Sequence, residues 1–236
     1  MSDVFGKIME DAIAGVKAVY TIERDDGYTT EGPVEQYIAA IDEWFECERD
    51  AIVLAKGKVL DIGSGAGRVL QYLHGKGIEA VGIDNSSAAI AACKSQGITN
   101  VEIMSATELD FEENTFDTVV MYGNNFGILG DVDMVVEMLR DIHRITKKDS
   151  IILACSRDPE KTDNEAHLRY HQQNREKGLL PGLVKLRIKY KGLIGDWFDL
   201  LMVNQQDMEK IATQAGWTVD RIFTSDSLYV GVLKKG

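Results

Sequence analysis

The 236-residue sequence is poor in proline and cysteine and has no long apolar run. Its three cysteines are widely spaced, which argues against a disulfide framework and favours a reducing compartment. No segment reaches the roughly 18 consecutive apolar residues that a membrane-spanning helix needs. The acidic start, MSDVFGKIMED, is unlike a signal peptide. We therefore expect a cytoplasmic protein with no membrane partner.

Positive charge is also scarce. The chain has 26 basic and 38 acidic residues, which gives a formal net charge of −12. This excess of acids argues against nucleic acid as a partner, because a phosphate backbone would be repelled. Hydrophobic residues make up 44% of the chain, which is typical of a folded globular protein. The length favours one large domain, or one domain with an insertion.

Short apolar runs alternate with helical patterns between residues 57 and 156. The runs KVLDIG, EAVGID, VEIMSA, FDTVVMYG and SIILACS have the length and composition of buried strands. Strands that alternate with helices predict a parallel sheet covered by helices on both faces. A helix capped by Asn204 and the runs WTVDRIFT and LYVGVLKK add a last helix and two strands. The prediction is an α/β fold with a Rossmann-like core over 57–156 and 204–236.

The two remaining segments have other patterns. Residues 1–56 favour a helical N-terminal extension, with a helix over 3–20, a loop from Thr21 to Gly32 and a helix over 34–56. Residues 157–203 interrupt the alternation of strands and helices. Their first half is polar, and LVKLRIKYKG with LIGDWFDLLMV predicts an antiparallel hairpin. We expect this insertion to form a lid over the substrate.

The turn Val59-Leu60-Asp61-Ile62-Gly63-Ser64-Gly65-Ala66-Gly67-Arg68 joins a buried strand to a helix. Glycines there let a ligand approach the backbone and the helix N-terminus. The dinucleotide fingerprint would place its last glycine where Arg68 stands. Asp61 would oppose a pyrophosphate but suits an ammonium group. Asp84 ends the second strand, where a carboxylate binds the hydroxyls of a ribose.

VLDIGSGAGR followed by VGID resembles the cofactor signature of class I S-adenosylmethionine-dependent methyltransferases, over about residues 57–155. The resemblance implies S-adenosylmethionine as cofactor and a seven-stranded, mostly parallel sheet whose last strand is antiparallel. It implies that Asp61 orients the amino group of the cofactor, Asp84 binds its ribose and Asn85 lies beside its adenine. The cofactor contacts that it implies or favours are Asp61, Gly63, Ser64, Gly65, Gly67, Arg68, Asp84, Asn85, Ser105, Ala106, Thr107, Tyr122 and Tyr28. Ser105 stands where many relatives carry an aspartate.

Candidate catalytic residues follow the fourth and fifth strands. Ligands of open α/β sheets bind outside the carboxyl ends of the strands, so Tyr122 and Asn124 should lie near the reacting methyl group. An asparagine there either orients the nucleophile or only stabilises a turn. His171 is a third candidate. It lies four residues after His167, but no third metal ligand is evident, so we expect no metal.

The insertion is rich in positive charge. Residues 166–195 contain seven basic residues and one acid. They form either a cover that attracts an anionic substrate or an exposed strand whose lysines prevent unwanted pairing.

The leading hypothesis is methyl transfer to nitrogen or oxygen of a small metabolite. Methylation of RNA or of a protein, and a non-catalytic cofactor-binding module, stay as alternatives. The sequence does not fix the oligomeric state.

Overall fold

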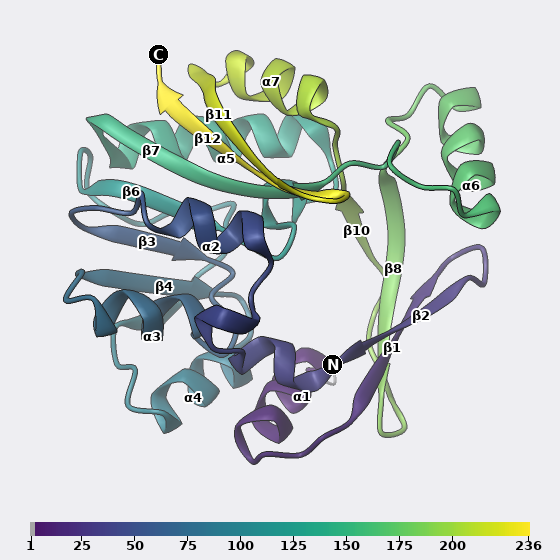
Figure 1. Cartoon of the computed structure of the whole chain (residues 1–236), viewed down its shortest axis with the longest axis horizontal. Helices are drawn as coiled ribbons and strands as arrows, with labels where there is room; N and C mark the ends of the chain where they lie inside the picture. The colour runs from purple at the N-terminus through teal and green to yellow at the C-terminus, as the bar shows by residue number, and fades with distance from the viewer. Residues whose placement is uncertain (1–2) are drawn as a thin grey trace.

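A seven-stranded sheet forms the core of the computed structural model, which describes residues 3–236 (Figure 1). The first two residues of the predicted extension lie outside the described part. The strands run in the order β11-β12-β7-β6-β3-β4-β5. Their bounds are β3 Val59–Ile62, β4 Ala80–Asp84, β5 Val101–Ile103, β6 Phe116–Met121, β7 Thr146–Arg157, β11 Trp217–Ser225 and β12 Leu228–Lys235. Strands β7, β6, β3, β4 and β5 are parallel, and β12 is antiparallel to both of its neighbours. The predicted Rossmann-like sheet is confirmed.

Helices cover both faces of this sheet. On one face, α5 (Val132–Ile145) and α7 (Gln205–Gln214) enclose a cluster of buried side chains. On the other face, α2 (Glu46–Ile52), α3 (Arg68–Gly75) and α4 (Ser87–Ser95) enclose a second cluster. The predicted cap of the last helix is confirmed, because the side chain of Asn204 accepts a hydrogen bond from the Asp207 amide at 2.9 Å. The two clusters hold the strands in place, so their carboxyl ends have fixed positions.

A second, smaller sheet joins the N-terminal segment to the insertion. Its strands are β1 (Val19–Arg24), β2 (Thr29–Pro33), β8 (Leu183–Tyr190), β9 (Leu193–Ile194) and β10 (Phe198–Leu201). They are antiparallel in the order β10-β8-β1-β2, with β9 paired to β8. The predicted hairpin of the insertion is therefore confirmed. Figure 1 shows this small sheet on the side of the molecule toward which β3 and β4 point.

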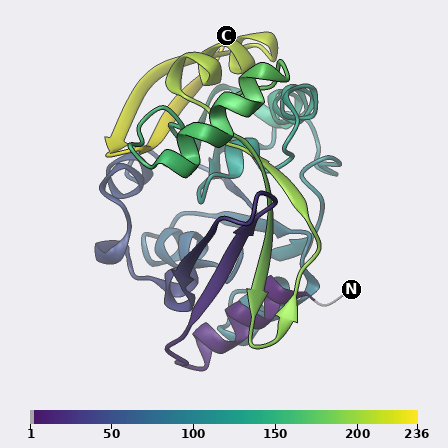
Figure 2. The ribbon, with the colours of Figure 1, turned by 90° about the vertical axis from the view of Figure 1, so that its right-hand side faces the viewer.

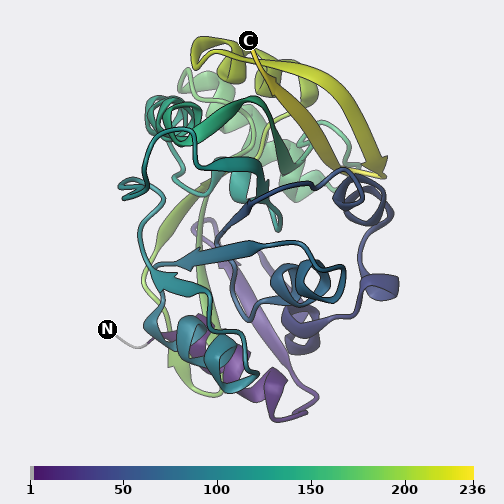
Figure 3. The same cartoon turned by 90° about the vertical axis from the view of Figure 1, so that its left-hand side faces the viewer.

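The N-terminal segment contains less helix than its pattern predicts. Helix α1 ends at Ile13, and the expected loop over 21–32 is instead the β1–β2 hairpin. The prediction was wrong because β1 is stabilised by β8, where Ile22 pairs with Ile188 far along the chain. The single helix expected over 34–56 is divided into η1 (Val34–Ile38), η2 (Ile41–Glu43) and α2. Helix α1 (Val4–Ile13) packs against α4, as Figure 3 shows.

Helix α6 (Glu165–Glu176) forms in the polar part of the insertion. The side chain of Asn164 caps it by accepting a hydrogen bond from the Ala166 amide at 2.9 Å. Figure 2 shows α6 crossing the upper end of the β1–β2 hairpin. Over residues 3–236, no helix combines the length and the apolar character needed to cross a membrane.

Candidate cofactor and acceptor site

The glycine turn lies between β3 and α3, and each of its three glycines has a positive φ: 72° at Gly63, 56° at Gly65 and 86° at Gly67. A Cβ atom at Gly67 would lie 2.6 Å from Ile98 Cδ1 and 3.0 Å from Cys93 Sγ, so this glycine allows α3 to pack closely. At Gly65 the nearest atoms would be Met9 Cε at 3.3 Å and Sδ at 3.8 Å, with Tyr37 Cδ1 also at 3.8 Å. The N-terminal segment therefore covers the middle of the turn.

Asp84, at the end of β4, holds this turn in place. Its carboxylate accepts hydrogen bonds from the Gly65 amide at 3.0 Å and from the Ser86 amide at 2.9 Å. Burial raises the pKa of Asp84, while these two amide donors lower it. Each carboxylate oxygen has a further lone pair. Asp84 therefore orders the backbone and can still accept hydroxyl donors.

The residues expected near adenine lie at the ends of β4 and β5. Asn85 follows Asp84 directly and is exposed. The hydroxyl groups of Ser105 and Thr107 lie 2.8 Å apart, and the Thr107 amide donates to Ser105 Oγ at 3.2 Å. The Met104 amide donates to the carbonyl oxygen of Asp84 at 3.1 Å, which ties the two strand ends together. The structure therefore brings Asn85 and the segment 105–107 to one corner, where their contact with adenine stays a prediction.

Asp61 is a buried carboxylate with an unused oxygen. Asp61 is 2% exposed, and its Oδ2 has no hydrogen-bond partner among residues 3–236. Burial raises the pKa of Asp61 to about 7, with Asp84 and Glu48 contributing in the same direction and Arg68 opposing them. A buried acceptor without a donor is costly, so this oxygen is suited to a cationic donor.

A second unused acceptor follows the neighbouring strand. Oδ1 of Asn124, in the loop after β6, is buried and also has no hydrogen-bond partner within the described part of the chain. The same loop is tied to the end of β3, because Asn125 Nδ2 donates to the carbonyl oxygen of Ile62 at 2.8 Å. The carboxyl ends of β3 and β6 thus present two acceptors, Asp61 and Asn124. An ammonium group has the donors that both of them need.

The predicted contacts Arg68 and Tyr122 are engaged elsewhere. Arg68 donates two hydrogen bonds of 2.9 Å to the carboxylate of Glu48, and its guanidinium lies 4.6 Å from the centre of the Trp44 ring. The Tyr122 hydroxyl donates to the carbonyl oxygen of Glu48 at 2.8 Å, and burial raises its pKa well above the usual range. The Tyr122 hydroxyl is therefore committed as a donor and poorly suited to act as a base.

The remaining predicted residue of the turn, Ser64, does not present its hydroxyl to the front of the turn. Ser64 Oγ is buried without a partner, and a Cβ atom at Gly82 would lie 2.9 Å from it. The side chain thus lies against β4. The Ser64 amide already donates to the Ile83 carbonyl oxygen at 3.0 Å, so a cofactor contact at Ser64 stays a prediction.

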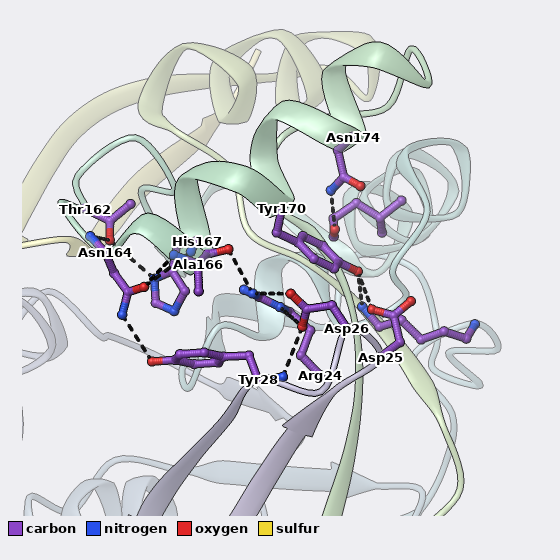
Figure 4. Close-up of polar contacts among 12 residues, drawn as sticks. Arg24, Asp25, Asp26, Tyr28, Thr162, Asn164, Ala166, His167, Tyr170 and Asn174 are labelled. Carbon is purple, nitrogen blue, oxygen red and sulfur yellow. Dashed lines mark hydrogen bonds and ion pairs between the residues drawn. The ribbon is translucent and has the colours of Figure 1, made fainter.

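Tyr28 and His171 lie on either side of His167, at the contact of α6 with the β1–β2 hairpin, and Figure 4 shows Tyr28 beside His167. The Tyr28 ring meets the His167 ring edge-on, with 4.9 Å between the centroids, and the His171 ring follows at 6.3 Å from His167. His171 is buried, and burial lowers its pKa to about 4, with the charges of His167, Arg175 and Arg24 adding to the effect. A histidine with this pKa is neutral at pH 7 and is a weak base. The structure places both residues between α6 and the β1–β2 hairpin.

Several residues of the site were missed by the sequence analysis. They are Met9 and Tyr37, which cover Gly65, and Trp44 and Glu48, which hold Arg68. All four come from the N-terminal segment, which has no motif at these positions. Over residues 3–236, no three His, Cys, Asp or Glu side chains are grouped to hold a metal ion.

Residues 59–149, which contain the glycine turn, Asp61, Asp84 and Asn124, match the model of a family described as a methyltransferase domain. This part of the chain is therefore similar to a methyltransferase domain. A curated relative is the Bacillus subtilis protein YqeM, named as a candidate methyltransferase. It is 28% identical over 120 residues, which are 49% of this chain and 48% of YqeM. The matched part thus spans about half the length of the curated relative.

Solved structures share the fold of this chain. A SAM-dependent methyltransferase from Bacteroides fragilis, in complex with S-adenosyl-L-homocysteine, has a TM-score of 0.83 and 24% identity, covering 99% of this chain and 95% of its own. One from Methanosarcina mazei has a TM-score of 0.66 and 16% identity, covering 79% and 95%. One from Clostridium acetobutylicum has a TM-score of 0.59 and 13% identity, covering 80% and 88%. The coverage of the first includes the small sheet as well as the domain.

Proposed function

We propose that this protein is an S-adenosylmethionine-dependent methyltransferase that acts on a nitrogen or oxygen of a small metabolite. The observation that carries the proposal is the pair of buried, unpartnered acceptors, Asp61 Oδ2 and Asn124 Oδ1, beside a glycine turn that Asp84 holds in place. These two acceptors suit the ammonium group of the cofactor, and Asp84 suits its ribose. A methyltransferase from Bacteroides fragilis with the same fold is solved with S-adenosyl-L-homocysteine, which supports the choice of cofactor.

The chemistry requires little from the protein beyond position. The cofactor supplies a methyl group on a sulfonium, whose carbon–sulfur bond breaks as the acceptor forms its new bond to the methyl carbon. The loop after β6 bears Asn124, whose amide can orient the nucleophile. The small sheet and α6 face the strand ends and can exclude water. A proton of a neutral acceptor would leave to solvent or to a base, because the Tyr122 hydroxyl is already engaged as a donor.

Isothermal titration with S-adenosyl-L-homocysteine tests the cofactor assignment. We expect binding, and we expect Asp84→Asn to weaken it by roughly 1–3 kcal/mol, the cost of an unpaired buried polar group. Asp110→Asn, an exposed change near the same corner, is the matched control and should bind as the wild type does. The assignment would be overturned if S-adenosyl-L-homocysteine did not bind to the wild type, or if it bound to Asp84→Asn as tightly as to Asp110→Asn.

The acceptor class is tested separately with radiolabelled cofactor. A pool of small metabolites should be labelled, whereas purified RNA and denatured protein should not. A nucleic-acid substrate would also bind in a salt-dependent way. Label transferred only to macromolecules would replace the small-metabolite proposal, and cofactor binding without any transfer would favour a non-catalytic module. The proposal includes a cytoplasmic location, which the three free and buried cysteines support.

A further inference from the structure

The second glycine of the turn, Gly65, is held at both of its backbone polar groups. Its amide donates to Asp84 Oδ2 at 3.0 Å, and its carbonyl oxygen accepts a hydrogen bond from Cys93 Sγ at 3.1 Å. Cys93 lies on α4 and is fully buried. Burial raises the pKa of this thiol to about 12, and the charges of Asp61 and Asp84 act in the same direction. The thiol therefore keeps its proton at neutral pH and remains a donor.

The next carbonyl group of the turn is held from the end of the same helix. Gln96 directly follows α4 and is half-buried, and its Nε2 donates to the Ala66 carbonyl oxygen at 2.8 Å. The Oε1 of Gln96 accepts a hydrogen bond from Gln71 Nε2, on α3, at 2.7 Å. This second bond sets the orientation of the Gln96 amide and turns its nitrogen toward the glycine turn. Two consecutive carbonyl groups are thus bound by side chains of α4 and its C-terminal end.

The third glycine makes room for the first of these bonds. A Cβ atom at Gly67 would lie 3.0 Å from Cys93 Sγ, so a side chain there would push the thiol away from the Gly65 carbonyl group. Gly67 therefore serves the hydrogen bond to Gly65 as well as the packing of α3.

A turn with three glycines needs such support. Glycine loses more backbone freedom than any other residue when it becomes ordered. A ligand that had to order this turn would bind more weakly, because part of its binding free energy would offset the lost entropy. Hydrogen bonds that order the turn before a ligand arrives remove this cost. The bonds from Cys93 and Gln96 are of this kind, because both residues bind the backbone of the turn.

We propose that Cys93 and Gln96 are positioning residues for the cofactor, because they order the glycine turn before the cofactor binds. This inference rests on the proposed function, since the turn is the segment expected to meet the cofactor. Neither residue needs to touch the cofactor. Cys93 acts through Gly65, whose amide donates to Asp84, the carboxylate assigned to the ribose. Without the thiol, Gly65 can rotate, and Asp84 loses the fixed donor that orients it.

Two variants at position 93 separate the hydrogen bond from packing. Cys93→Ala and Cys93→Ser both shrink a buried side chain, so both should lose stability in urea unfolding, but only serine keeps a donor. In isothermal titration, we expect Cys93→Ala to bind S-adenosyl-L-homocysteine roughly three- to tenfold more weakly than the wild type, as the loss of one neutral hydrogen bond predicts. Cys93→Ser should recover most of this affinity. A role in packing alone would lower the affinity of both variants or of neither.

Gln96 gives an independent test, because its side chain is only half-buried. Gln96→Leu keeps a side chain of similar size and removes the donor to Ala66, so it should also weaken binding by roughly three- to tenfold. Lys94→Leu introduces the same residue at an exposed position of α4 and is the matched control, which should bind as the wild type does. Gln96→Leu keeps the inference testable if the variants of Cys93 fail to fold.

A double-mutant cycle tests the route from Cys93 to Asp84. Cys93→Ala and Asp84→Asn both disturb the hydrogen bonds of Gly65, so together they should weaken binding by less than the product of their separate effects. The carbonyl carbon of Gly65 reports on the same route without a ligand. Its NMR signal should shift in Cys93→Ala and return toward the wild-type position in Cys93→Ser.

The inference would be overturned if Cys93→Ala and Gln96→Leu bound S-adenosyl-L-homocysteine as tightly as the wild type, or if Cys93→Ser bound as weakly as Cys93→Ala. Independent effects in the double-mutant cycle would overturn the route through Gly65. Failure of the wild type to bind S-adenosyl-L-homocysteine would instead overturn the proposed function. In that case the carbonyl signal of Gly65 would still show whether the thiol holds the turn.

Discussion

Glu48 binds Arg68 through two hydrogen bonds of 2.9 Å, while Asp61 keeps one carboxylate oxygen unpartnered in the same buried region. Glu48 thus largely neutralises the positive charge of Arg68. Counting Asp61 as ionised, the three groups carry a net charge of −1, which a ligand ammonium group would balance. The negative charge of Asp61 is therefore uncompensated where we expect a ligand cation to bind. This charge lowers the stability of the ligand-free protein.

Asp61 should make the stability of the ligand-free protein depend on pH. Its native pKa of about 7 lies above the ordinary value of 3.8. Between these values the native state keeps a proton that the unfolded state releases, so this contribution to the free energy of unfolding falls as pH rises from about 4 to 7, by about 1.4 kcal/mol per pH unit. Asp61→Asn should remove this slope in urea titrations and weaken cofactor binding at least about tenfold. The prediction would be contradicted if the free energy of unfolding depended on pH in the same way in the wild type and in Asp61→Asn.

Glu48→Gln should change the pH at which the cofactor binds best. Without the charge of Glu48, Arg68 acts more strongly on Asp61, so the pKa of Asp61 should fall. The midpoint of the pH dependence of S-adenosyl-L-homocysteine affinity should move to lower pH with it. The variant should also lose up to about 3–5 kcal/mol of stability, because it leaves a buried arginine poorly paired. Glu46→Gln, an exposed change on the same helix, is the control, and an unmoved midpoint in Glu48→Gln would refute the coupling.

Gly67 should tolerate alanine poorly for two separable reasons. A left-handed backbone costs a non-glycine residue roughly 1–2 kcal/mol, and the new methyl group would press on Ile98 and Cys93, at a further cost of roughly 1–3 kcal/mol. Gly77→Ala is a matched control, because Gly77 has a φ of 71° and no atom within 4 Å of the added Cβ. The difference between the two variants in urea unfolding measures the packing cost. Equal losses would mean that α3 shifts to make room.

The sequence predicted the large sheet well because its information is local. Buried parallel strands such as β3 and β6 are short, mostly apolar runs, and Asp61 and Asp84 stand out as acids at or next to the ends of β3 and β4. The β1–β2 part of the small sheet could not be found in this way, because β1 pairs with β8, where Ile22 meets Ile188 far along the chain. The role of Glu48 was hidden for the same reason, since a glutamate in a helix is ordinary until the fold brings Arg68 to it.

Arg24 should control the mobility of α6, because it is the buried link between this helix and the β1–β2 hairpin. Arg24→Met keeps the apolar stem but removes the hydrogen bonds to Asp26 and Ala166, so we expect a loss of about 1.5–3 kcal/mol. Amide hydrogen exchange should quicken in residues 165–176 and at the hairpin tip and stay slow in β3. Arg169→Met is the control, because Arg169 lies on α6 with a side chain that is 68% exposed and only a 3.5 Å contact to Glu165. Unchanged exchange in α6 of Arg24→Met would show that the helix is held instead by Tyr170, whose hydroxyl donates to Asp25 at 2.8 Å and accepts from the Lys185 amide at 3.3 Å.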